Sequence, residues 1–205
     1  MRFVFLSPAD PQPLLVPQTA ATFQTDGKMQ TAPFNVPSRY QQVYDKSEFA
    51  ALKTPVRITE LAFRPVEDQQ AQGHKIERIQ FRLSTFKQSP AELSTIFDKN
   101  VGRDEVVVFE GPLTLRTRMR RSRGSTLQCD IAVPLSKPFV YNPAEGSLLL
   151  EIRNFGGANA TFYVNGCDAP TTRIVYADAI PNRVGAGIIQ NGGMVTQLTF
   201  ASVAK

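Results

Sequence analysis

The sequence predicts an all-β protein, a jelly-roll-like antiparallel β-sandwich with one short helix and an extended N-terminal arm. Apolar and polar residues alternate in short segments between about residues 56 and 200, as at Ile79, Phe81 and Leu83. Side chains with a period of two lie on opposite faces of a strand, so each segment buries one face. The segments recur at intervals of roughly 8–15 residues, and Gly, Pro and Asn separate them, as in sandwiches and barrels.

The chain of 205 residues suits one large β-domain that is preceded by an arm. We expect the arm at 1–38, where six prolines interrupt regular structure, and the sandwich at 39–205. Short apolar pieces of the arm, Phe3–Leu6 and Leu14–Val16, have the character of an edge strand, added either in cis or to a neighbouring chain. The 14 Phe and the lack of Trp predict that phenylalanine supplies most of the aromatic packing.

The strands of the sandwich are predicted in chain order from the same alternation. The first is at 39–44, and a helical turn at Asp45–Phe49 follows it. The next strand, Val56–Phe63, changes phase near Glu60, as a β-bulge would cause, and a long strand follows at 75–86. Later strands are expected near 105–110, 112–118, 126–133, 138–141, 147–153, 160–164, 172–177 and 194–200.

One short helix is predicted over about residues 90–99. Ser89 is a capping residue, Pro90 suits the first helical position, and Glu92 occupies the third. We expect this helix to end at Asn100 or Gly102, in the left-handed conformations that close many helices.

The residues after this helix resemble a calcium loop. Asp98, Asn100, Asp104 and Glu105 are the candidate ligands, because calcium takes about six to eight oxygens from a tight turn. The third ligand position is Gly102, and the distal bidentate Glu is missing. We therefore favour the alternative, in which these residues only close the helix, and we expect no other cofactor.

The net charge of +5 comes from one cluster of arginines. Arg116, Arg118, Arg120, Arg121 and Arg123 lie close together without an intervening acid, and the other basic residues are balanced by the 18 acidic ones. Such a patch attracts phosphate, sulfate or an anionic polysaccharide. The alternative, which we favour, is a solvated hairpin whose leucines at 113 and 115 face inward. Because aromatic residues do not interleave with the arginines, we expect no nucleic-acid binding.

Residue counts argue against catalysis. His74, in a polar loop where we expect it to be solvated, is the only histidine, so sites that need two are excluded, and no G-x-S-x-G elbow is present. A glycosidase needs only two carboxylates. The acids in or beside predicted strands mostly alternate opposite to the apolar side, as solvent-facing acids do; they are Glu60, Glu77, Glu105, Glu110, Asp130 and Glu151. We predict a protein that is not an enzyme, with a carbohydrate-active hydrolase as the less favoured alternative.

The cysteines and tyrosines each allow two interpretations. Cys129 and Cys167 have no metal or redox spacing, and we favour a buried thiol and a partly exposed one over a disulfide. The five tyrosines would form a sugar-stacking platform if several shared a face. We favour rings that are buried at strand ends with their hydroxyls in water. The tyrosines are Tyr40, Tyr44, Tyr141, Tyr163 and Tyr176.

A set of strand and turn segments is similar to a known family. They are 33–35, 39–45, 58–64, 79–85, 93–97, 100–102, 111–115, 138–143, 146–152 and 195–200. Together they resemble bacterial secreted β-sandwich proteins of the PEP-CTERM-associated type. The resemblance implies an exported protein at the cell surface or in an extracellular matrix, and it assigns no activity to any position. No signal peptide is recognisable, and the chain ends at Ala204-Lys205 without a Val-Pro-Glu-Pro motif, so we expect no anchoring through such a tail.

The resulting hypothesis is a non-enzymatic extracellular binding or structural module that recognises a polysaccharide or another anionic surface. Its loops and concave sheet would make the contacts. The alternative is a self-assembling coat or filament subunit, a homo-oligomer in which the arm exchanges a strand with a neighbour. No apolar stretch approaches the ~18–20 residues of a membrane helix, so no membrane span is expected.

Overall fold

The computed structural model describes residues 12–21, 29–30, 33–66, 73–117, 128–157, 163–178 and 186–203. The strands are β1 (Gln12–Val16), β2 (Met29–Gln30), β3 (Ser38–Tyr44), β4 (Val56–Phe63), β5 (His74–Phe86), β6 (Val106–Leu115), β7 (Ile131–Tyr141), β8 (Ser147–Asn154), β9 (Val164–Cys167), β10 (Thr172–Asp178), β11 (Ile188–Asn191), β12 (Gly193–Met194) and β13 (Thr196–Ser202). Four short 3-10 helices join them: η1 (Gln18–Ala21), η2 (Lys46–Phe49), η3 (Pro90–Glu92) and η4 (Phe97–Lys99).

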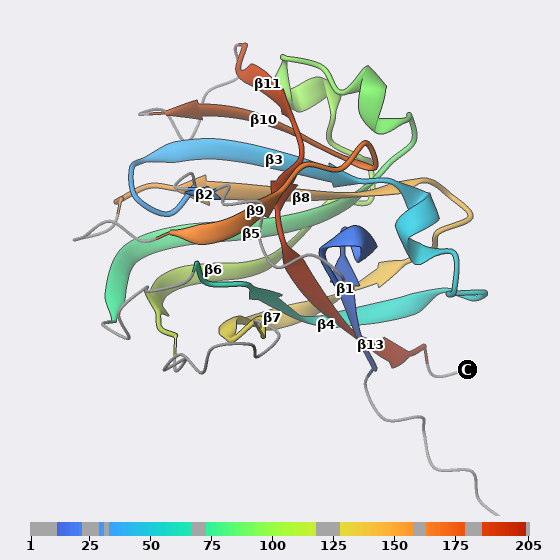
Figure 1. The fold of residues 1–205 in the computed structure, drawn as a ribbon, viewed down its shortest axis with the longest axis horizontal. Helices are drawn as coiled ribbons and strands as arrows, with labels where there is room; N and C mark the ends of the chain where they lie inside the picture. Colours follow the sequence, from blue (N-terminus) through green and yellow to red (C-terminus); the bar gives the residue numbers. More distant parts are fainter. Residues whose placement is uncertain are drawn as a thin grey trace, which may run out of the picture.

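The strands form an all-β sandwich, as the alternation predicted. One sheet has the order β1-β13-β4-β7, and the facing sheet has the order β11-β10-β3-β8-β5-β6 (Figure 1). A smaller sheet, β12-β9-β2, accompanies them. Strand pairing between the named strands of the described residues is antiparallel throughout.

The pairing follows the scheme of a jelly roll. β3 pairs with β8, β4 with β7, and β5 with β6, so the three pairs are nested along the chain. The outer and inner pairs belong to the six-stranded sheet, and the middle pair belongs to the four-stranded sheet. Nested pairs that alternate between two sheets arise when one long hairpin rolls up, which is the jelly-roll arrangement.

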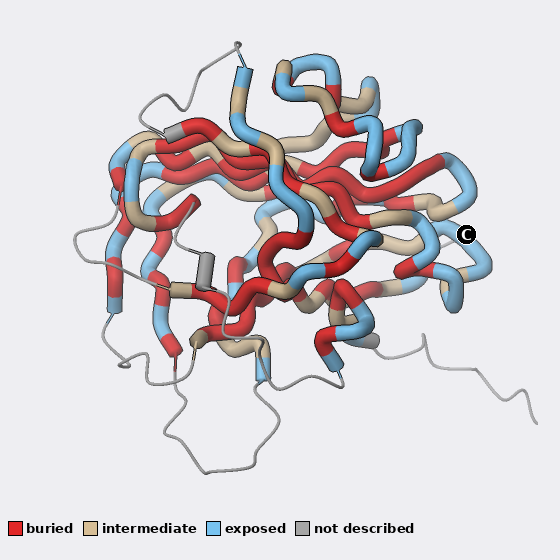
Figure 2. Tube along the Cα trace, turned by 45° about the horizontal axis from the view of Figure 1, so that its top comes forward, coloured by how far each residue is buried: buried red, intermediate tan, exposed pale blue. Residues whose placement is uncertain are grey.

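Phenylalanine fills much of the space between the sheets, as the composition predicted. The ring centroid of Phe63, on β4, lies 5.4 Å from that of Phe34 and 6.2 Å from that of Phe81, on β5. Phe81 in turn lies 6.0 Å from Phe109, on β6. This row of rings connects the two sheets, and the strands around it are largely buried (Figure 2).

Three tyrosines belong to the same core, which corrects both interpretations of their role. Tyr40, Tyr44 and Tyr141 are fully buried, and so are their hydroxyls. The Tyr141 hydroxyl donates to the carbonyl of Gly146 at 2.9 Å, and that of Tyr44 lies 2.6 Å from Thr196 Oγ1. Burial raises the pKa of all three phenols. These rings are therefore not available to stack on a sugar, and their hydroxyls are not in water.

Part of the predicted arm is built into the sandwich. β1 pairs with β13 of the same chain, and Val16 is fully buried. Two buried charged side chains hold η1: Glu48 Oε2 accepts from the Gln18 N–H at 2.7 Å, and Arg64 Nη1 donates to a carbonyl of η1 at 2.9 Å. Leu14–Val16 thus lies in an edge strand in cis, whereas Phe3–Leu6 lies outside the described residues.

Two strands continue where the sequence predicted breaks. β6 passes through Gly111, whose φ of 149° glycine adopts readily. β7 passes through Pro134 and Pro138. Proline is tolerated in a strand at positions whose backbone N–H is not needed for a hydrogen bond to the neighbouring strand. The predicted bulge is confirmed, because the register of β4 against β7 shifts between Ile58 and Glu60.

Two short 3-10 helices replace the single helix that was predicted over about 90–99. η3 begins with the expected cap, in which Glu92 Oε2 accepts from the Ser89 N–H at 3.0 Å. η3 cannot continue as a longer helix, because the Asn100 side chain binds both the backbone N–H and the backbone carbonyl of Ser94. The amide oxygen of Asn100 accepts from the Ser94 N–H, and its amide nitrogen donates to the Ser94 carbonyl, each at 2.8 Å.

Residues 87–105, the covering segment, lie over the outer face of the six-stranded sheet. Leu93 and Phe97 of this segment pack with Val43 of β3 and Val175 of β10 in a second, smaller hydrophobic cluster. The sheet is therefore buried on both faces in this region, and any polar residue of its outer face that lies beneath the segment is removed from water.

Candidate functional site

The structure describes one of the five clustered arginines. Arg116 follows β6 and is exposed, and Leu113 and Leu115 before it are buried, as the hairpin interpretation predicted. Arg118, Arg120, Arg121 and Arg123 lie outside the described residues, so anion binding by the cluster stays a prediction.

The acidic candidate calcium ligands each bind a different protein partner. Asp98 Oδ1 accepts from Arg39 Nη2 at 2.8 Å. Asp104 accepts from the N–H and the hydroxyl of Thr85, at 2.9 and 2.6 Å. Glu105, the last candidate, accepts from an arginine of β5. Within the described residues, no group of three or more His, Cys, Asp or Glu is arranged to hold a metal ion. Calcium binding by these residues therefore stays a prediction.

The end of η4 also differs from the expected helix terminus. Asn100 has φ −91° and ψ −18°, which is right-handed, so the left-handed expectation is wrong for this residue. Gly102 is needed for a different reason, since a Cβ there would lie 2.3 Å from the Thr85 carbonyl oxygen. Glycine at this position permits the close approach of the covering segment to β5.

A buried ion pair joins β3 to β8 beneath the covering segment. The Arg39 and Glu151 side chains are 1% and 2% exposed, and Arg39 Nη2 lies 3.0 Å from Glu151 Oε2. Gln41 and Arg153 also donate to the Glu151 carboxylate. The Arg39 guanidinium lies 4.8 Å from the Phe97 ring centroid. Glu151 is thus buried, not solvent-facing as its strand phase predicted, because the covering segment closes this face.

Three other acids considered for hydrolysis, Glu77, Glu105 and Glu110, are also engaged in ion pairs. Glu105 Oε2 lies 2.8 Å from Arg82 Nη1, and Glu110 Oε1 lies 2.9 Å from Arg78 Nη2. The hydrogen bonds from Arg78 lower the pKa of the Glu110 carboxyl, whereas a general acid needs a raised pKa. His74 is buried at the start of β5 and not solvated in a loop, as was expected.

A cleft of about 570 Å³ lies where the two ends of the covering segment meet the end of β5. Lys87, Lys99 and Arg103 line it, and we call it the cationic cleft. Each of these three residues is exposed, and none forms an ion pair with another described residue. Two acids also line the cleft, Asp104 and Glu145, and both accept hydrogen bonds from neighbouring side chains.

Sequence reasoning missed these three cations because they do not form a run. Lys87 precedes η3, whereas Lys99 and Arg103 lie at the far end of the covering segment. The turns of η3 and η4 bring the two ends together, and no local pattern signals this closure. The available sequence signal was that single basic residues stand at both ends of the predicted helix.

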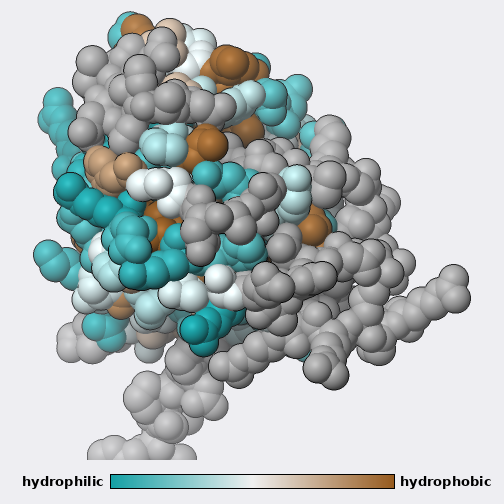
Figure 3. Space-filling view, turned by 90° about the vertical axis from the view of Figure 1, so that its left-hand side faces the viewer, coloured by the Kyte–Doolittle hydropathy of each residue, from teal (hydrophilic) through white to brown (hydrophobic). Residues whose placement is uncertain are grey.

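Large hydrophobic side chains that are exposed in the described part of the chain are scattered; they are Val36, Val140, Ile188 and Val203. The face in Figure 3 shows hydrophilic residues between separate hydrophobic ones.

No family model, curated protein or solved structure matches this chain. The resemblance of its strand and turn segments to exported bacterial proteins therefore stays a prediction. In the described ranges, none of the helices has the length and apolar character to cross a membrane.

Cys129 is expected to react slowly with alkylating reagents. Cys129 and Cys167 form no disulfide, and burial raises the pKa of the Cys129 thiol to about 11. In a Cys167→Ser variant at pH 8.5, the smaller thiolate fraction should slow iodoacetamide labelling on the order of 100-fold relative to an exposed thiol of pKa ~8.5. The rate should rise about tenfold per pH unit towards pH 11. The urea-unfolded chain is the control, and a half-maximal rate near pH 8.5 in the folded protein would contradict the assignment.

Proposed function

We propose that this protein is a non-enzymatic binding module that recognises an anionic polysaccharide through the cationic cleft. The observation that carries the proposal is the convergence of Lys87, Lys99 and Arg103 on one cleft, where none of them forms an ion pair with another described residue. Unpaired cations in a recess attract anionic groups and form charge-assisted hydrogen bonds with them. Sulfate and carboxylate groups of a polysaccharide supply such acceptors at regular intervals.

The position of the cleft suits a long, flexible ligand. Lys87 continues from β5, and Arg103 leads into β6, so both lie at the ends of paired strands of the six-stranded sheet. A rigid sheet that presents charged loops from its edge is the usual way in which sandwiches carry binding functions. We extend the proposal to an exported protein at the cell surface or in a matrix, which rests on the sequence resemblance alone.

Replacing Lys87, Lys99 and Arg103 together by Ala is expected to weaken binding to a sulfated or uronate-rich polysaccharide by at least ~10-fold. Three exposed charge contacts at about 0.5–1 kcal/mol each give this magnitude. Affinity should be measured by isothermal titration at low and at physiological salt, because screening weakens exposed contacts. For the unsubstituted protein, the affinity should fall as salt rises.

The matched control is a second triple variant, Lys53, Lys75 and Lys137→Ala, which removes three exposed lysines away from the cleft. It lowers the net charge by the same amount. Equal loss of affinity in both triple variants would show that only net charge matters, and unchanged binding by the cleft variant would reject the site. A neutral glucan that binds as tightly as the anionic polymer would also reject it.

Self-assembly by strand exchange is a second candidate, and the edge position of β1 favours it. β1 covers β13 at the edge of the four-stranded sheet, so the same segment from a neighbouring copy could cover it instead. Sedimentation of the full-length chain over a range of micromolar concentrations tests this proposal. A dimer or longer series that grows with concentration is expected, and a monomer throughout would reject it.

A further inference from the structure

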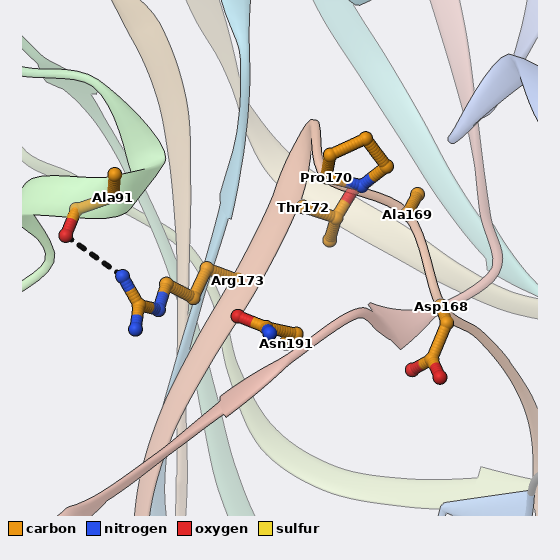
Figure 4. A pocket seen from close by; sticks show the side chains of 7 residues that line it. All are labelled: Ala91, Asp168, Ala169, Pro170, Thr172, Arg173 and Asn191. Carbon is orange, nitrogen blue, oxygen red and sulfur yellow. Dashed lines mark hydrogen bonds between the residues drawn. The ribbon is translucent and has the colours of Figure 1, made fainter.

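A second cleft, of about 390 Å³, lies between η3 and the strands β10 and β11 (Figure 4). Arg173 on β10 and Asn191 on β11 are direct partners in the strand register, so their side chains lie on the same face. The loop before β10 lines the cleft with Asp168, Ala169 and Pro170. The cleft therefore combines a guanidinium, an amide and a carboxylate with small apolar surfaces.

Arg173 is held in place but is not fully hydrogen-bonded. Its Nη1 donates to the carbonyl of Ala91, on η3, at 2.7 Å, which fixes the position of the guanidinium. Its Nε is buried and has no hydrogen-bond partner. A guanidinium carries five N–H donors in one plane, and a buried donor without an acceptor is costly. The buried Nε is closed to a ligand, but Nη2 is not buried and forms no hydrogen bond with another described residue, so an oxyanion in the cleft can bind there.

The polar groups are separated along the cleft. In Figure 4, Arg173 and Asp168 lie at opposite ends, and Asn191 lies between them. A ligand carboxylate at Arg173 is therefore kept away from the like charge of Asp168. Hydroxyl groups suit the other positions, because the amide of Asn191 donates and accepts and a carboxylate accepts.

We propose that this cleft binds a sugar acid, a small hydroxylated ring that carries one carboxylate. The carboxylate binds Arg173, the hydroxyls bind Asn191 and Asp168, and the C–H face of the ring lies against Ala169 and Pro170. The volume is near the lower end of the roughly 300–1,000 Å³ of small-molecule sites, which suits a monosaccharide. The inference goes beyond the proposed function, because none of these residues lines the cationic cleft.

The test uses D-glucuronate as the probe and D-glucose as the matched ligand without a carboxylate, measured by ligand-observed NMR on the full chain. We expect glucuronate to bind at least ~10-fold more tightly than glucose, as the charge-assisted contact to arginine predicts. Arg173→Gln should abolish this preference. Arg173→Lys should also lose most of it, because lysine lacks the planar fork that binds a carboxylate.

Asn191→Ala is the second variant, since Asn191 is exposed and its truncation spares the fold. It should weaken glucuronate and glucose binding alike, by about threefold or more. Lys99→Ala, in the cationic cleft, should leave glucuronate binding unchanged, which separates this inference from the polysaccharide proposal. Equal binding of the two sugars, no binding of either, or full preference in folded Arg173→Gln would each overturn the assignment.

Discussion

Replacing Glu151 by Gln is expected to lower the free energy of unfolding by about 3–5 kcal/mol, the range for breaking a buried ion pair. Arg39, which is 1% exposed, would lose its buried counter-ion Glu151, and the exposed Asp98 would remain beside it. Gln41 and Arg153 would lose the same charged acceptor. Urea unfolding followed by far-ultraviolet circular dichroism measures the change.

The control for this prediction is Glu77→Gln, an isosteric change on β5. Glu77 pairs with Lys75 at 2.9 Å, but both side chains are more than half exposed. Exposed pairs contribute little, so the free energy of unfolding should change by less than about 0.5 kcal/mol. Comparable losses in both variants would mean that Glu151 is not shielded by the covering segment, and the description of that face would be wrong.

Phe63→Ala should have an effect of similar size, about 3–5 kcal/mol, for a different reason. Phe63 is fully buried and stands in the row of rings between the two sheets. Its truncation removes the contacts to Phe34 and Phe81 and leaves a cavity that rigid sheets cannot close. The same urea titration measures the loss. The slope of the free energy of unfolding against urea concentration should stay unchanged if the unfolded state is unaffected.

Phe63→Leu is the comparison that tests the cavity explanation. Leucine keeps most of the apolar volume, so the loss should be clearly smaller, about 1–2 kcal/mol. Equal losses for Ala and Leu would show that the edge-to-face contact with Phe34, and not the filled volume, dominates at this position. A loss under about 1 kcal/mol for Ala would contradict the placement of Phe63 in the core.

The covering segment connects the two proposed sites. Its ends carry Lys87, Lys99 and Arg103 of the cationic cleft, and Ala91 on η3 accepts the hydrogen bond that positions Arg173 in the second cleft. The buried ion pair beneath it therefore supports both clefts at once. A substitution at Glu151 that loosened the segment would be expected to weaken polysaccharide and sugar-acid binding together.

The sequence by itself determined the class of fold and most of the strands. The period-two alternation is a local property, so β4 was predicted with its bounds of Val56–Phe63, and the bulge within it was visible as a change of phase. The turn at η2 and the cap at Ser89 were also readable, because their signals lie within a few residues. Leu113 and Leu115 faced inward as predicted.

The tertiary structure alone decided which polar residues are buried and which charges meet. Glu151 was predicted in solvent because strand phase reports only that a residue lies on the face opposite the core. Whether another segment covers that face depends on contacts between residues more than 50 positions apart in the sequence, such as the contact of Asp98 with Arg39. The two clefts have the same origin. The path of the covering segment over the sheet brings Lys87 close to Arg103 in the cationic cleft, and it brings Ala91 close to Arg173 in the second cleft. No short-range sequence pattern encodes this path.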